Sequence, residues 1–163
     1  QGPVYLRFGR PKVPNFTDLN QRFEIGKGIV LNEGKDVTIV ATGHLVWESI
    51  LAGQKLSEMG ISAEIINIHT IKPIDNALIL KSISKSRCLV SAEEHNFLGG
   101  LGESISRVLS ENDPVPQEFV ATNDTFGESG SPSKLMDKYG LNSDAIVNAV
   151  KKVLSRKWKI IIY

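Results

Sequence analysis

Cysteine is nearly absent from this sequence, because Cys88 is its only example among 163 residues. One cysteine cannot form an internal disulfide or a metal site that needs several thiolates. Cys88 opens the apolar run Cys88-Leu89-Val90, so we expect a buried thiol with a structural role. A reducing, cytoplasmic environment fits this composition.

Long hydrophobic runs and an excess of one charge are also missing. No apolar stretch approaches the roughly 20 residues that span a bilayer, and no signal peptide opens the chain. The formal net charge is +1, so no broad basic field points to nucleic acid or to an acidic membrane. The chain starts without a methionine, which we interpret as a removed leader or a piece of a longer protein.

Several catalytic signatures are absent as well. The three histidines, His44, His69 and His95, lack a zinc-site spacing such as H-E-x-x-H. No G-x-S-x-G elbow marks a nucleophilic serine. The glycine-rich stretch 93–104, EEHNFLGGLGES, matches neither a P-loop nor a G-x-G-x-x-G turn after a first strand.

The stretch 93–104 still allows two interpretations. In an independent enzyme, His95 would be a general base oriented by Glu94, and a helix beginning near Gly102 would hold an anion. In the other interpretation, the loop is a surface that packs against another domain or subunit. The second is favoured, because no complete catalytic constellation accompanies the loop.

What the sequence does contain is a regular alternation of strands and helices. The hydrophobic content of 41% and charged content of 23% suit a globular protein of one domain. Apolar periodicity predicts strands near 29–31, 37–41, 63–68, 88–92 and 116–122, and helices near 45–59, 76–86, 101–109 and 143–154.

The order of these elements predicts an α/β fold. Strand–helix–strand units require parallel pairing, whereas the first two strands flank the short loop NEGKD and are expected to form an antiparallel hairpin. We therefore predict a three-layer α/β/α sandwich with a five-stranded, mostly parallel sheet and one antiparallel strand. Residues 116–122 are the expected edge strand.

Local signals place the ends of several helices. Gly60 is positioned to end the first helix, and Asp75 to cap the second. Ser143 or Asp144 is the expected cap of the last helix. The segments after the four later strands should meet at the carboxyl edge of the sheet, where ligands usually bind in such folds.

The two ends of the chain differ from this core. Residues 1–27 are rich in proline; Val4-Tyr5-Leu6 would be the last strand of a preceding domain, and residues 11–26 a linker. The regular domain spans 28–157. The tail 158–163 is unassigned, with an extra edge strand or a partner contact among its open roles.

Five blocks of the sequence occur in an informative order. They are GPVYLRFGRPKVP, GKGIVLNEGKDVTIVATGHLVWESILAGQKL, INIHTIKPID, EEHNFLGGLGESI and FGESGSPSKLMDKYGL. Together they resemble the C-terminal domain of transketolase, preceded by the last residues of a pyrimidine-binding domain. Deoxyxylulose-phosphate synthases and the beta subunits of 2-oxoacid dehydrogenases share this domain, but the blocks look more like transketolase in its split form.

The resemblance implies an accessory role. Transketolases transfer a two-carbon ketol unit between sugar phosphates with thiamine diphosphate and a divalent ion such as magnesium. The missing pyrophosphate- and pyrimidine-binding domains hold that cofactor, so this chain alone is expected to be inactive and to carry no catalytic residue. The complete enzyme would be a homodimer or heterotetramer. A regulatory ligand site in the accessory domain is the alternative.

The resemblance also implies roles for individual residues. Arg10 is the best match to an arginine that contacts the substrate phosphate, and Arg7 is the second choice. His44 receives no catalytic role. Residues expected to pack against neighbouring domains or the second subunit are His69, Lys72, Glu94, His95, Gly99, Gly100 and Gly102.

Overall fold

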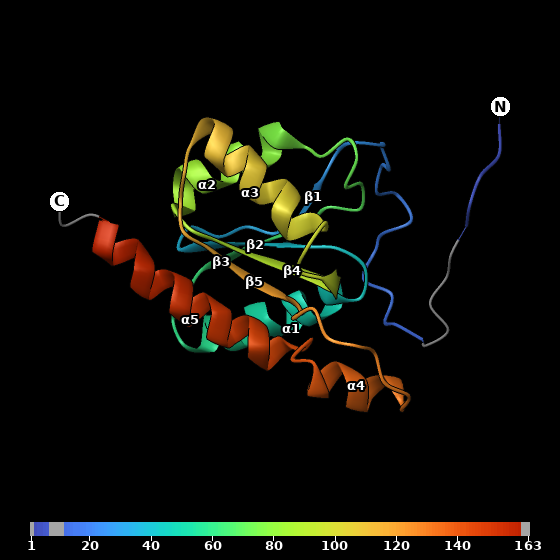
Figure 1. Cartoon of the computed structure of the whole chain (residues 1–163). Coiled ribbons are helices and arrows are strands. Elements are labelled where there is room, and N and C mark those ends of the chain that lie inside the picture. The colour runs from blue at the N-terminus through green and yellow to red at the C-terminus, as the bar shows by residue number, and fades with distance from the viewer. Residues whose placement is uncertain (1, 7–11, 161–163) are drawn as a thin grey trace.

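A five-stranded sheet with helices on both faces forms the structure (Figure 1). The computed structural model describes residues 2–6 and 12–160, and side chains only as far as Lys157. The elements are β1 (Ile29–Asn32), β2 (Val37–Ala41), α1 (Leu45–Glu58), β3 (Ala63–Asn67), α2 (Asn76–Ser86), β4 (Leu89–Asn96), α3 (Leu101–Asn112), β5 (Gln117–Thr122), α4 (Pro132–Lys138) and α5 (Ser143–Ile160).

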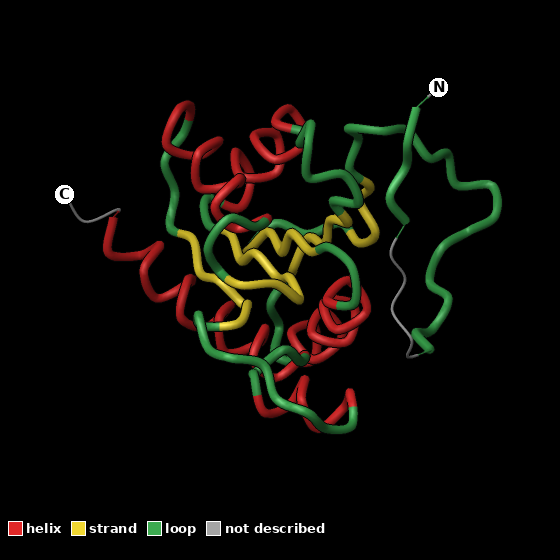
Figure 2. The backbone as a smooth tube through the Cα atoms, turned by 45° about the vertical axis from the view of Figure 1, so that its right-hand side comes forward, coloured by secondary structure: helices red, strands yellow, loops and turns green. Residues whose placement is uncertain are grey.

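Helices lie on both faces of the sheet (Figures 1 and 2). An apolar core fills the space between the sheet and the helices on each face. On one face, α1 and α5 pack over side chains of β2 and β4 that include Ile39 and Val90. On the other, α2 and α3 pack over Val40, Ile66 and Leu89. The predicted three-layer α/β/α sandwich is therefore confirmed, with alternate residues of the buried strands feeding opposite cores.

Strand order overturns the predicted hairpin while confirming the single antiparallel strand. The order is β1-β3-β2-β4-β5, so β3 lies between β1 and β2. β1 runs antiparallel to β3, with Ile29 opposite Asn67, and the other pairs are parallel. The expected hairpin between β1 and β2 is wrong. The edge position predicted for β5 is confirmed.

Gly34 explains why the loop NEGKD resembled a hairpin turn. The loop crosses the start of β3, and a Cβ on Gly34 would lie 2.2 Å from the carbonyl carbon of Ala63. Lys35 and Asp36 donate their backbone N–H groups to the carbonyl oxygen of Ser62, just before β3. The glycine therefore permits a close backbone crossing rather than a tight turn between paired strands.

The helix ends mostly follow the sequence signals. Gly60, with φ +75°, ends α1 as expected. Asp75 caps α2 by accepting a hydrogen bond from the Leu78 N–H at 3.1 Å. The predicted cap of α5 is wrong, because Asn142, rather than Ser143 or Asp144, accepts from the Ala145 N–H at 3.0 Å.

Helix α4 is the element that the sequence prediction omitted. Ser131-Pro132 begins it, and proline is favoured at the first helical position because it has no N–H to leave unpaired. Its seven residues bury no side chain completely, so it lacks the apolar stripe that revealed the longer helices. Tyr139, directly after α4, bonds through its hydroxyl to the Phe126 carbonyl oxygen.

The remaining expectations concern Cys88 and the chain ends. Cys88 is fully buried, as predicted. Burial raises the pKa of its thiol to about 11, Asp36 adds to this rise, and Lys157 opposes it.

Residues 2–6 form no strand in this structure, and α5 continues through residue 160, so the first part of the tail is helical. Among the described residues, none of the helices has the length and apolarity needed to cross a bilayer.

Candidate functional site

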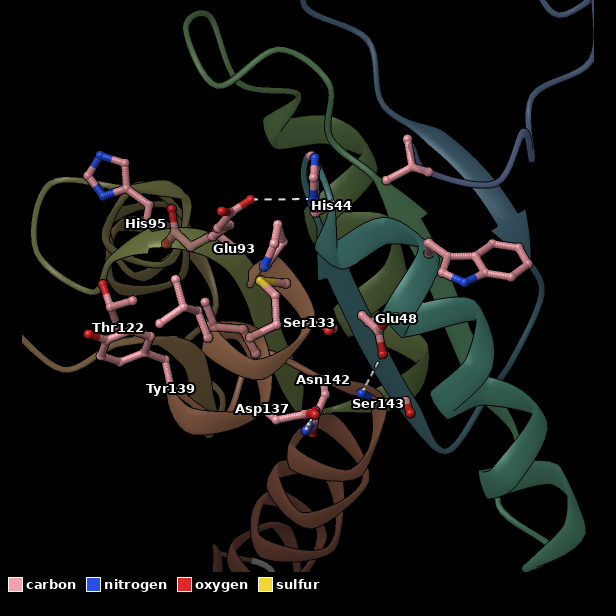
Figure 3. Close-up of a pocket in the computed structure, with 18 of the residues that line it drawn as sticks. His44, Glu48, Glu93, His95, Thr122, Ser133, Asp137, Tyr139, Asn142 and Ser143 are labelled. Atoms are coloured by element: carbon pink, nitrogen blue, oxygen red, sulfur yellow. Dashed lines mark hydrogen bonds and ion pairs between the residues drawn. The ribbon is translucent and has the colours of Figure 1, made fainter. Parts of the chain in front are cut away.

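A broad cleft of about 1420 Å³ opens at the carboxyl edge of the sheet (Figure 3). Its walls come from segments that are distant in sequence: residues 12–14, the start of α1, the end of β4, and the stretch from Gly127 to Asp144. The carboxyl ends of parallel strands meet at one edge, which is where this fold usually places ligands.

His44 and Glu94 both line the cleft and lie next to one another. His44 precedes α1, and its Nδ1 lies 3.6 Å from Oε2 of Glu94 in β4. The pair links the ends of neighbouring strands β2 and β4 at the rim. Both side chains are partly exposed, so the link is worth little energetically.

The three histidines do not converge on a common point. His95 is exposed, and its Nδ1 lies 2.9 Å from the Asn96 carbonyl oxygen. In Figure 3 it lies on the far side of Glu93 from His44. His69 belongs to a different loop and pairs with Phe23. Within residues 2–6 and 12–157, no three histidine, cysteine, aspartate or glutamate side chains gather as a metal site requires.

Glu93 occupies the helix start that the sequence offered as an anion site. Its buried carboxylate accepts the Leu101 N–H at 2.7 Å and the Gly102 N–H at 2.8 Å. These are N–H groups that the first turn of α3 leaves without helical partners, and the negative charge also suits the positive end of the helix. An external phosphate would have to displace this carboxylate to reach the same two N–H groups.

The glycines of this turn make room for Glu93 and for a ring beyond it. A Cβ on Gly100 would lie 2.2 Å from Oε2 of Glu93, and one on Gly102 would lie 2.5 Å from Cδ1 of Phe119. Both glycines are buried, so they touch their own chain rather than present a surface. Gly99 is exposed with φ +77°, and its N–H donates to Glu103 at 2.7 Å.

The segment 69–75, HTIKPID, contacts residues that precede β1. The ring of His69 lies over Phe23, with centroids 4.3 Å apart. Gly26 packs against Pro73, whose Cγ would be 3.2 Å from a Cβ at that glycine. The Gly28 N–H donates to Oδ2 of Asp75 at 3.1 Å. Lys72, also predicted as an interface residue, is exposed.

Sequence reasoning missed two contributors to the cleft. Glu48 of α1 accepts the Ser143 N–H at 2.8 Å and so joins α1 to the start of α5 (Figure 3). α4 and the residues around it form another wall. The signal for α4 was the Ser-Pro pair, but nothing local linked Glu48 to a residue 95 positions away.

Arg10 and Arg7, the predicted phosphate contacts, lie outside the described residues. Lys12, two positions after Arg10, lines the cleft. The described residues do not fit thiamine diphosphate or magnesium: the α3 start already holds Glu93, and the acidic side chains do not cluster.

Comparisons with known proteins agree on one family. A family model described as the transketolase C-terminal domain matches residues 26–146. The chain is 43% identical over 156 residues to a 6-deoxy-6-sulfo-D-fructose transketolase subunit, SqwH, of Clostridium sp. (strain MSTE9). It is 38% identical over 160 residues to a putative transketolase C-terminal section of Methanocaldococcus jannaschii. These matches cover 96% of this chain and 48% and 50% of the relatives.

A solved structure and more distant relatives extend the comparison. A structure described as a split gene transketolase, inactive beta4 tetramer, matches with a TM-score of 0.87 and 44% identity, covering 89% of this chain and 48% of that one. A 1-deoxy-D-xylulose-5-phosphate synthase of Halothermothrix orenii is 35% identical, and the match covers 25% of its length. The chain thus spans about half the length of the first curated relatives.

Proposed function

The chain belongs to the transketolase C-terminal-domain family, and from this premise we propose that it serves as the accessory C-terminal domain of a split transketolase. The complete enzyme transfers a two-carbon ketol unit between sugar phosphates. The observation that carries this proposal is the match, over 96% of this chain, to relatives of about twice its length that are named as a transketolase subunit and as a putative transketolase C-terminal section.

This domain supplies packing surfaces rather than chemistry. Its best candidate for an anion site is filled by its own Glu93, and its histidines lie apart. Thiamine diphosphate and magnesium are therefore assigned to the pyrophosphate- and pyrimidine-binding domains, which act as partners of this chain. The exposed loop residues Glu94, His95 and Lys72 are proposed contacts with those partners, in a cytoplasmic enzyme.

The complete enzyme is proposed to be a homodimer or a heterotetramer of two kinds of section. The structural relative described as an inactive tetramer of beta chains supports this, because a section that lacks its partner would associate with itself and stay inactive. Deoxyxylulose-phosphate synthase is the less supported alternative, since its match has lower identity and covers a smaller share of the relative.

Complementation tests this function. The chain is mixed with separately produced pyrophosphate- and pyrimidine-binding sections, thiamine diphosphate and magnesium, and ketol transfer between sugar phosphates is measured. We expect transfer in the full mixture, none from the chain alone, and little when the chain is left out. Turnover of a sugar by the chain alone, or its tight stoichiometric uptake of thiamine diphosphate, would overturn the proposal.

Arg10 is the proposed contact with the substrate phosphate, with Arg7 as the second choice. A guanidinium group stays charged at physiological pH and can donate two hydrogen bonds to phosphate oxygens. In the complete enzyme, Arg10→Ala should raise KM for phosphorylated acceptors much more than for unphosphorylated ones. Equal losses for both classes would rule this role out.

The cleft supports a second candidate function, a regulatory ligand site. Its volume of about 1420 Å³ is sufficient for a small molecule. Thermal unfolding of the chain with sugar phosphates or nucleotides tests this: a saturable rise in the midpoint at micromolar ligand supports a binding module. An unchanged midpoint across the series favours a surface that serves packing alone.

A further inference from the structure

The linker, which we define as residues 12–27, lies against the loops at the carboxyl edge of the sheet (Figures 1 and 2). Two ring pairs join it to the domain. Phe16 stacks on Trp47 of α1, with centroids 6.5 Å apart and planes 24° apart. Phe23 lies on His69, with centroids 4.3 Å apart and planes 32° apart. Both separations are close to those at which aromatic rings attract one another.

The end of the linker is fixed by the same segment that holds Phe23. Gly26 packs on Pro73, and the N–H of Gly28, directly after the linker, donates to Asp75. Three positions of HTIKPID therefore contact three successive points along residues 23–28. This convergence gives the segment a visible role, which is to receive the linker.

The linker has little else to fix its position. In the described part of the chain, the hydrogen bonds of residues 12–27 join linker residues to one another, such as Thr17 to Asn15 and Asn20 to Asp18. Phe16 also packs on the apolar core beneath α1, whereas Phe23 remains 67% exposed. Ring contacts therefore determine the path of a segment that begins as a wall of the cleft.

We propose that Trp47 and His69 are positioning residues whose rings hold the linker on this domain, and so set where the preceding domain stands relative to the cleft. The first half, that these rings hold the linker on the domain, requires only the 163-residue chain. The second half rests on the proposed function, because it requires the preceding pyrimidine-binding domain and its phosphate contact.

Trypsin cleavage of the 163-residue chain tests the first half. Arg22 lies in the linker with its side chain 88% exposed, so its cleavage reports how well the linker is held. Trp47→Ala and His69→Ala should each speed cleavage after Arg22 by about two- to tenfold, the range that corresponds to losing one aromatic pair. His69→Phe keeps a ring without the bond from Nδ1 to the Thr70 hydroxyl, so it should restore protection, as should Trp47→Phe.

Two comparisons separate a loosened linker from an unfolded domain. Phe126→Ala removes a ring that is 97% exposed and is the matched control; it should leave cleavage after Arg22 unchanged. Cleavage after Lys151, within α5, reports unfolding of the whole domain. Unchanged cleavage after Arg22 in both alanine variants, or an equal acceleration at Lys151, would overturn the proposal.

Kinetics of the reconstituted transferase test the second half. His69→Ala should raise KM for phosphorylated acceptors severalfold with little change in kcat, and His69→Phe should restore KM. If linker cleavage accelerates while KM stays constant, the positioning role is overturned and the holding contact alone survives. If the wild-type mixture transfers no ketol unit, the proposed function fails, but the cleavage result still stands.

Discussion

The turn at 93–102 and the segment 69–75 lie at the carboxyl ends of β4 and β3, two strands that β2 separates, and they make different contacts. The first folds onto itself: Glu93 accepts two N–H groups only eight and nine residues further along. The second receives residues far away in sequence, with Gly28 and Asp75 47 positions apart. One stabilises its own helix, whereas the other attaches a linker.

Residues that match the pattern of one family therefore need not have the same role in the structure. Both loops were predicted as interface from the same resemblance. In the structure, the Glu93 carboxylate and the Phe119 ring pack where side chains on Gly100 and Gly102 would lie. His69 and Pro73 instead contact the linker. Substitutions that remove contacts within the turn at 93–102 should therefore lower the free energy of unfolding of the whole domain. Substitutions in the segment 69–75 should instead make the linker more accessible to trypsin and to amide exchange.

Glu93→Ala should produce the largest loss of stability. It leaves two N–H groups at the start of α3 without their acceptor and removes a charge that favours the helix end. We expect the free energy of unfolding to fall by about 2–4 kcal/mol, measured by urea unfolding. Glu94→Ala is the matched control, because that neighbouring carboxylate is half exposed, and it should change stability by less than about 1 kcal/mol.

Formate offers a sharper test of the Glu93 contact. A small carboxylate can enter the space that Glu93→Ala leaves and accept the same two N–H groups. Formate at millimolar concentration should therefore raise the unfolding midpoint of Glu93→Ala and leave wild type unchanged. Equal unfolding free energies of Glu93→Ala and Glu94→Ala would show that the Glu93 carboxylate does not stabilise the start of α3.

Gly102→Ala should have the next largest effect. The added Cβ would lie 2.5 Å from the Phe119 ring, and such overpacking costs about 1–3 kcal/mol, partly offset by the better helix propensity of alanine. Gly127→Ala is the control, because nothing lies within 4 Å of its Cβ position. In a Phe119→Ala background the cost of Gly102→Ala should shrink by about 1 kcal/mol, and an unchanged cost would exclude the ring as its cause.

Periodicity was sufficient to predict the layers because burial repeats along each element. The apolar stripe of α5 and the β-branched run of β3 each identify an element from a few neighbouring residues. Strand order follows from contacts between segments, so the sequence could not show that β3 separates β1 from β2. α4 was missed because a short, exposed helix carries no such stripe.

The site was predictable in location but not in detail. Loops at the carboxyl edge follow from parallel pairing, and these loops do line the cleft. The contacts of individual residues were harder to predict. The sequence pointed to Glu94 and His95, but the buried neighbour Glu93 is the residue that accepts the N–H groups of Leu101 and Gly102. A carboxylate near the end of a strand, such as Glu93 in β4, can face either side of the sheet, and only the fold decides which.

Asp75→Ser should separate the two functions of one side chain. Asp75 caps α2 through Oδ1 and accepts the Gly28 N–H through Oδ2. Serine is a good cap but has one oxygen, so it should keep the cap and lose the contact with Gly28. We expect a change of about 1 kcal/mol or less in unfolding free energy, with severalfold faster amide exchange at Gly28. Asp75→Ala, which loses both contacts, should also speed exchange at Leu78, and faster exchange at Leu78 in the serine variant would contradict the separation.

The pair of His44 and Glu94, which lines the cleft, should give the smallest effect. Their separation of 3.6 Å allows an ion pair only while His44 is protonated, and partial exposure lets water and salt screen it. A double-mutant cycle with His44→Ala and Glu94→Ala should give a coupling energy below about 1 kcal/mol that declines further in high salt. A larger, salt-independent coupling energy would mean that this pair stabilises the domain about as much as the contacts of Glu93 do. In that case the exposed carboxylate of Glu94 would stabilise the fold as much as the buried carboxylate of Glu93, contrary to the screening expected at the surface.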